Sequence, residues 1–103
     1  MTGTSIQEKK QVAVNQNIAE PPMYSVIYLD DDVTTYEFVI SSLVNYFSYS
    51  DAGAAEKARE IDEEGSAIVA EYPYEIAEQK GTDVVLLARS NGFPLNLKLE
   101  PVE

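Results

Sequence analysis

The segment Met23–Phe38, MYSVIYLDDDVTTYEF, decides the fold of this chain. Its Val26–Leu29 portion is a β-branched and aromatic run, which predicts a buried strand. The run stops at Asp30–Asp32, because burying an unpaired charge is costly. Thr34 and, three residues later, Glu37 form a capping box, which predicts that a helix opens at Thr34. Three carboxylates are therefore expected at the end of a strand, where they would attract a cation.

The composition excludes several classes of protein. The 103 residues are enough for one domain, and 45% apolar with 24% charged residues is typical of a globular chain. There is no cysteine and no histidine, so thiolate chemistry and the commonest general base are missing. A net charge of −11 argues against nucleic acid. Without a membrane-spanning run or a signal peptide, we expect a cytoplasmic protein that makes no membrane contact.

The remaining segments predict a small α+β sandwich. Residues 1–22 are polar and lack steady periodicity, which predicts a flexible N-terminal arm closed by two prolines and followed by one folded domain, 23–103. Periodicity and caps predict a β-α-α-β-α-β order, with a three-stranded antiparallel sheet and three helices packed on one face. After the first strand, the expected elements are a helix from Thr34 or Thr35 to about Ser48, a helix capped by Asp51 and ended by Gly65, a strand Ser66–Tyr72, a helix Tyr74–Ser90 and a strand Leu95–Glu100.

Two metal-site hypotheses compete for the aspartates. An EF-hand loop is disfavoured because the acids are contiguous and the required glycine is missing. The receiver domain of response regulators is the main alternative, since VIYLDDD and Gly81–Ala88 (GTDVVLLA) resemble its magnesium-binding and phosphoacceptor strands. However, no carboxylate stands at Ala88 or Arg89, where the phosphoacceptor would fall, and the chain is too short for a five-stranded doubly wound fold.

Catalysis is not expected, and binding remains. Asp30 and Asp62 could act as an acid–base pair, but the chain has no nucleophile elbow, phosphate loop or nucleotide fingerprint. A protonated amino group is bound well by several acceptors in fixed positions, with an apolar pocket beside them. The residues that could wall such a pocket are Tyr36, Val39, Ile61 and Leu95, although the last three are also ordinary core types. A structural interaction domain with an occluded pocket is the third possibility.

Three segments carry a resemblance to a known family. They are PPMYSVIYLDDDVTTYEFVISSLVNYFSYS (Pro21–Ser50), AIVAEYPYEIAEQK (Ala67–Lys80) and ARSNGFPLNLKLE (Ala88–Glu100). Together they resemble ClpS, the family of adaptors of the Clp AAA+ proteases that recognise N-end rule substrates. The similarity extends from Pro21 to about Glu100.

The resemblance implies a non-enzymatic adaptor without cofactor or metal. Such a protein binds the bulky hydrophobic N-terminal residue of a substrate and delivers the substrate to a Clp AAA+ protease, with the arm taking part in delivery. By position, the α-amino group would be held by Asp30, Asp31, Asp32, Thr34 and Asp62, the first side chain would enter a cavity lined by Tyr36, Val39, Ile61 and Leu95, and the N-terminal domain of a ClpA- or ClpC-like ATPase would meet Glu75, Glu78 and Lys80.

Three positions depart from the family pattern. Asp30 replaces the usual asparagine and Asp62 the usual histidine, so the expected amine site gains negative charge. This crowding should raise the pKa of at least one carboxylate. Tyr36 replaces a methionine that gates the cavity, and a stiff phenol is expected to narrow the set of accepted side chains.

Overall fold

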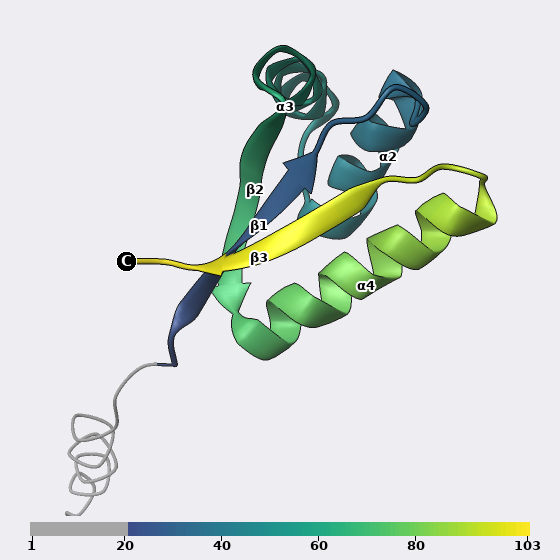
Figure 1. Cartoon of the computed structure of the whole chain (residues 1–103). Coiled ribbons are helices and arrows are strands. Elements are labelled where there is room, and N and C mark those ends of the chain that lie inside the picture. Colours follow the sequence, from purple (N-terminus) through teal and green to yellow (C-terminus); the bar gives the residue numbers. More distant parts are fainter. Residues whose placement is uncertain (1–20) are drawn as a thin grey trace, which may run out of the picture.

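The computed structural model describes residues 21–103, which form one antiparallel sheet with helices on one of its faces (Figure 1). The predicted α+β fold is confirmed. The boundary between arm and domain stays a prediction, because residues 1–20 lie outside the described residues. In chain order the elements are β1 (Met23–Leu29), α2 (Tyr36–Phe47), α3 (Asp51–Glu64), β2 (Ser66–Pro73), α4 (Tyr74–Ser90) and β3 (Asn96–Pro101).

The predicted first strand, β1, is the central strand, and the sheet order is β2-β1-β3. Tyr28 is paired with Ala67 on one side and Leu97 on the other, so its position in the sheet is defined by both neighbours. A bulge in the β1–β2 ladder places Val69 as an extra residue on β2. Both β2 and β3 are edge strands of the described sheet.

One hydrophobic core lies between the sheet and the helices. Val26 and Tyr28 of β1 and Leu43 of α2 are fully buried in it. The Tyr28 hydroxyl and the Ser42 hydroxyl are hydrogen-bonded at 2.6 Å, which satisfies the polar atoms that these side chains bring into the core. Burial raises the pKa of the Tyr28 phenol, so Tyr28 stays neutral over the physiological range.

The helix starts differ by one residue from two of the predictions. Thr35, not Thr34, caps α2, and its hydroxyl accepts a hydrogen bond from the Phe38 N–H at 3.1 Å. Ser50, not Asp51, caps α3, by accepting from the Gly53 N–H. Adjacent residues with similar capping ability cannot be ranked from sequence, because the choice depends on which residue has an extended backbone. The predicted end of α3 at Gly65 is confirmed, with a left-handed φ of 89°.

Candidate functional site

A hollow of about 340 Å³ lies at the end of β1, between α2 and α3. We call it the acidic hollow. It contains all five residues predicted for the amine site and three of the four predicted for the apolar cavity. Its lining consists of Asp30, Asp31, Asp32, Thr34, Tyr36, Val39, Ala58, Ile61 and Asp62.

The turn after β1 is organised by Asp31. One oxygen of its carboxylate, Oδ1, accepts the backbone N–H groups of Val33 at 2.8 Å and Thr34 at 2.7 Å. The other, Oδ2, accepts the Thr34 hydroxyl at 2.7 Å. Partial burial acts to raise the pKa of Asp31, but these hydrogen bonds, helped by the charge of Arg89, hold that pKa below its ordinary value. Asp31 therefore stays ionised, and Thr34 contributes to this turn instead of capping α2.

Asp30, just after β1, and Asp62, on α3, both line the acidic hollow. The Asp30 N–H donates to the carbonyl of Gly65 at 3.0 Å, which fixes the end of β1 to the end of α3. Loss of water around the Asp30 carboxylate raises its pKa, and so does the negative charge of Asp62, followed by those of Asp31 and Asp32. The expected carboxylate with a raised pKa is thus Asp30. A cationic group placed among these oxygens would relieve their repulsion.

Apolar side chains form the inner part of the acidic hollow. Val39 of α2 and Ile61 of α3 are buried there, as predicted from their helical spacing. Ala58 also lines the hollow and was not among the predicted pocket residues. Its position one turn before Ile61 was the signal available in the sequence, since residues three apart share a helix face.

Of the other two residues predicted for the apolar cavity, Tyr36 lies at the exposed part of the hollow and Leu95 lies in the core. Tyr36 is 44% exposed, and its hydroxyl donates to the carbonyl of Ala55 at 3.2 Å, so its side chain reaches from α2 to α3. Leu95 is only 1% exposed, belongs to the core cluster and is not among the residues that line the hollow. The alternating leucines of the last strand did not distinguish a core position from a pocket wall.

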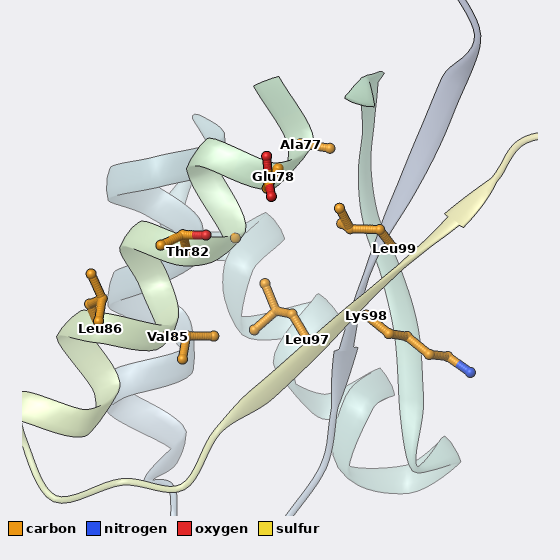
Figure 2. A pocket seen from close by; sticks show the side chains of 9 residues that line it. Ala77, Glu78, Thr82, Val85, Leu86, Leu97, Lys98 and Leu99 are labelled. Atoms are coloured by element: carbon orange, nitrogen blue, oxygen red, sulfur yellow. The ribbon is translucent and has the colours of Figure 1, made fainter. Parts of the chain in front are cut away.

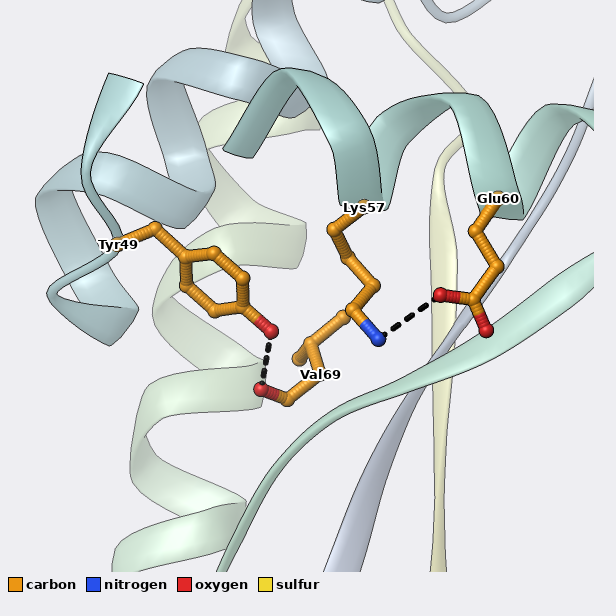
Figure 3. A network of polar contacts seen from close by, with 4 residues as sticks. All are labelled: Tyr49, Lys57, Glu60 and Val69. Carbon is orange, nitrogen blue, oxygen red and sulfur yellow. Dashed lines mark hydrogen bonds and ion pairs between the residues drawn. The ribbon is translucent and has the colours of Figure 1, made fainter. Parts of the chain in front are cut away.

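The connection between α2 and α3 sets the position of α3, which forms one wall of the acidic hollow. The Tyr49 hydroxyl donates to the carbonyl of the bulge residue Val69 at 2.7 Å, which ties this connection to β2 (Figure 3). Figure 3 also shows the ion pair between Lys57 and Glu60 at 3.0 Å. Both residues of this pair lie on α3, so it does not position α3 against α2, and as a partly exposed pair it contributes little to stability. The hydrogen bond of Tyr49 is therefore the more important contact for holding α3 opposite α2.

The residues predicted for ATPase docking lie on α4. Glu75 and Glu78 are exposed, while Lys80 is half-buried. Lys80 Nζ donates to the carbonyl of Tyr46 at 2.9 Å and lies 5.5 Å from the ring centroid of Tyr72. Lys80 therefore has a structural contact of its own, at the last turn of α2, where helix carbonyls lack partners within the helix.

Other kinds of site receive no support in the described part of the chain. Within residues 21–103 no group of three or more acidic side chains is arranged to hold a metal ion. Gly81–Ala88, which resembles a receiver strand, belongs to α4. None of the helices described in the structure is both long and apolar enough to cross a bilayer. The acidic hollow offers carboxylates, hydroxyls and apolar carbon, which suit the binding of an amine that bears an apolar group.

Comparison with known proteins assigns the family. The model of the family described as ATP-dependent Clp protease adaptor protein ClpS matches residues 19–98. The chain is 40% identical over 94 residues to the ClpS adapter of Nautilia profundicola, covering 91% of this chain and 97% of that relative. It is 39% identical over 99 residues to the one of Clostridium acetobutylicum, covering 96% of each.

A solved structure gives the same result. ClpS2 of Agrobacterium tumefaciens, bound to L-phenylalaninamide, is similar with a TM-score of 0.78 and 34% sequence identity, covering 81% of this chain and 100% of that one. The sequence resemblance, the family match and the shared fold agree. The chain belongs to the ClpS family of ATP-dependent Clp protease adaptor proteins.

Proposed function

We propose that this chain is a non-catalytic adaptor that binds the free N-terminus of a substrate whose first residue is bulky and hydrophobic. The observation that carries this proposal is the acidic hollow itself, in which carboxylates and an apolar inner wall lie side by side. The ligand of the related ClpS2, L-phenylalaninamide, has the matching chemistry, an α-amino group next to an aromatic side chain.

The amine would be held mainly by carboxylates other than that of Asp31. The Asp31 carboxylate is engaged by Thr34 and Val33, so it orients the turn and adds charge. Asp30 and Asp62, which both line the hollow and whose charges are close enough to interact, are the groups best placed to accept hydrogen bonds from an ammonium. Hydrogen bonds to an ionised group are the stronger kind. The first side chain would then lie against Val39, Ala58 and Ile61.

Tyr36 is the residue that would restrict the choice of first residue. Its ring is tethered to α3 through Ala55, so it limits the opening between the helices. A methionine there adapts its shape more easily than a phenol. We therefore expect Tyr36→Met to widen the set of accepted first residues, with Tyr36→Phe as the control that removes only the hydroxyl.

Delivery would follow capture. Glu75 and Glu78 on α4 present exposed charge to the N-terminal domain of a ClpA- or ClpC-like ATPase, in the cytoplasm. This surface belongs to a different helix from those that wall the hollow, so a substrate and an ATPase could be bound together.

One titration tests capture. Peptides that begin with Leu, Phe, Tyr, Trp, Met or Arg are each compared with their N-acetylated forms. Acetylation removes the ammonium and is expected to abolish binding, while Arg peptides are expected to bind poorly because the inner wall is apolar. Asp31→Ala should weaken capture by more than about 1.5 kcal/mol, since it removes a negative charge from the hollow and the hydrogen bonds to a charged acceptor that hold the turn. Asp83→Ala, which removes a charge on α4, is the control. Equal binding of blocked and free peptides would refute the proposal.

A further inference from the structure

A second concave surface lies between α4 and β3, and it shares no lining residue with the acidic hollow. We call it the α4–β3 groove; its volume is about 260 Å³. Val85 and Leu86 of α4 line one side, and Leu97 and Leu99 of β3 line the other (Figure 2). Leu86 is 63% exposed, which is unusual for a leucine. The groove is therefore an apolar surface that no element within residues 21–103 covers.

The strand that borders the groove has backbone groups that point outward. The Val102 N–H donates to the Met23 carbonyl at 2.8 Å, so these two residues form a hydrogen-bonded pair. Such pairs alternate with non-hydrogen-bonded pairs along an antiparallel ladder. Because the β1–β3 register runs without interruption, the backbone N–H and C=O groups of Leu97 and Leu99 point away from β1. No strand of the described sheet pairs with them there.

The two edges of the sheet differ in how far they are protected. On β2, the bulge at Val69 interrupts the ladder, and the Val69 carbonyl accepts the Tyr49 hydroxyl at 2.7 Å. Bulges and covered backbone groups keep an edge from pairing with another strand. The β1–β3 ladder has no bulge. Of the two edges, β3 is therefore the one at which a strand can be added.

We propose that the edge of β3 and the α4–β3 groove together bind a short extended segment of another protein, with apolar residues at alternate positions and basic residues beside them. In a sheet, residues directly opposite each other on neighbouring strands point to the same face. The residues opposite Leu97 and Leu99 would therefore lie on the face that carries α4, with their side chains in the groove. This inference does not rest on the proposed function.

The edge itself limits the length of the segment. The next residue whose backbone nitrogen would point outward is Pro101, and proline has no N–H to donate. The strand begins only at Asn96, one residue before Leu97. Within β3 the edge therefore offers a full set of donors and acceptors at Leu97 and Leu99 alone, which suits about three paired residues, the outer two of them apolar.

Charge determines which flanking residues fit. Glu78 lines the groove and lies on the α4 side of it (Figure 2). The ammonium of Lys98 is paired with Glu100 at 3.0 Å and points away from α4 (Figure 2). The net charge of the chain is −11, so its field attracts a positively charged segment. The same charge opposes association with a second copy of the chain through this edge.

A blocked peptide tests the proposal on the full chain. The probe is acetyl-Thr-Val-Thr-Val-Lys-Lys-amide, which has no free α-amino group, so its binding is separate from capture in the acidic hollow. Amide hydrogen exchange is read by NMR. With the peptide at about ten times its Kd, exchange of the Leu97 and Leu99 amides should slow about tenfold, because it then proceeds from the free fraction. The amides of Lys98 and Glu100, already in pairs bonded to β1, serve as the internal reference.

Three altered peptides separate the parts of the contact. Serine in place of both valines removes the apolar side chains, and glutamate in place of both lysines reverses the charge. Methylation of the backbone nitrogens of all threonines and valines removes the donors to β3. Each change should weaken binding at least about fivefold. The proposal is overturned if the methylated or the serine peptide binds as tightly as the parent peptide.

A protein variant approaches the contact from the other side. Leu86→Ser removes an exposed apolar side chain from the groove and should weaken binding of the parent peptide about fivefold or more. Ile68→Ser makes a similar change at a 49% exposed residue of β2 and should leave binding unchanged. Equal binding by both variants and the parent overturns the proposal. Protection of the Leu97 and Leu99 amides that rises with protein concentration without peptide also overturns it, because that result assigns the edge to a second copy.

Discussion

The Thr34 hydroxyl donates to Asp31 Oδ2 at 2.7 Å, while the Thr34 N–H donates to Oδ1 of the same carboxylate at 2.7 Å. Thr34 thus contacts both oxygens of Asp31 and closes the turn between β1 and α2. The geometry of the acidic hollow depends on this turn, since the aspartates on either side of Asp31 take their direction from it.

Removing the Thr34 hydroxyl should therefore destabilise the protein. Thr34→Val keeps the shape but loses one hydrogen bond to a charged acceptor, so the free energy of unfolding at pH 7 should fall by about 1 kcal/mol. Thr34→Ser keeps the hydroxyl and should stay close to the parent. Urea unfolding measures both; equal losses in the two variants would show that the methyl group matters and the hydrogen bond does not.

Capture of a free N-terminus should depend on pH in a bell-shaped manner. As pH falls, Asp30 is protonated first, because its pKa is raised, so affinity should begin to fall above the ordinary carboxylate value of about 3.9. Asp31, with its lowered pKa, stays ionised to lower pH. At high pH the peptide's α-amino group loses its proton near pH 7.7–8.0, roughly its ordinary pKa. In Asp30→Asn the loss of affinity on the acidic side should begin at a lower pH than in the parent. An unchanged pH dependence on that side would contradict the role of Asp30.

The raised pKa of Asp30 and the lowered pKa of Asp31 should change the pH dependence of folding stability in opposite directions. Asp31 contributes stability above its unfolded pKa, and this is lost as pH falls through its lowered folded value. Asp30 has a raised folded pKa, so its contribution becomes less favourable as pH rises through that range. Urea unfolding of Asp31→Asn and Asp30→Asn between pH 3 and 7 should show slopes of stability against pH that change in opposite directions relative to the parent.

Lys80 should contribute to stability independently of any partner. Lys80→Met removes the hydrogen bond to the Tyr46 carbonyl and a cation near the end of α2, so the free energy of unfolding should fall by about 1–2 kcal/mol. Lys98→Met is the matched control, because among residues 21–103 Lys98 makes only an exposed ion pair, with Glu100. Equal stability of the two variants in thermal unfolding would contradict this assignment. Docking should accordingly be tested with Glu75→Gln and Glu78→Gln.

Gly81 should be replaceable with a gain in stability. It lies inside α4 with no left-handed φ, and a Cβ added there would meet Leu97 Cδ2 at 3.7 Å, an ordinary contact. Gly81→Ala should therefore stabilise the protein by about 0.5–1 kcal/mol. Gly65→Ala is the opposite control, because its φ of 89° strains any side chain. A loss of stability in Gly81→Ala would mean that the groove side of α4 tolerates no added methyl group.

Several predictions failed only in detail, and for local reasons. The capping residues were misplaced by one position because Thr34 and Thr35, or Ser50 and Asp51, have similar capping ability. Leu95 was expected in the cavity, and the alternation of leucines could not show that its side chain is enclosed by the core. The docking role of Lys80 stays a prediction, but its additional contact with Tyr46, 34 positions away, cannot be read from local sequence.

The sequence alone determined the order of the elements, the ends of most helices and the family. These follow from local patterns, such as the run at Val26–Leu29, the glycine after α3 and the motif around Asp30–Asp32, because backbone preference and apolar periodicity act over a few residues. Only the tertiary structure decided which carboxylates share a site. Asp30 and Asp62 are 32 positions apart, and they meet because the Asp30 N–H bonds to Gly65 while α3 is held opposite α2. Long-range packing makes that choice, and no local signal encodes it.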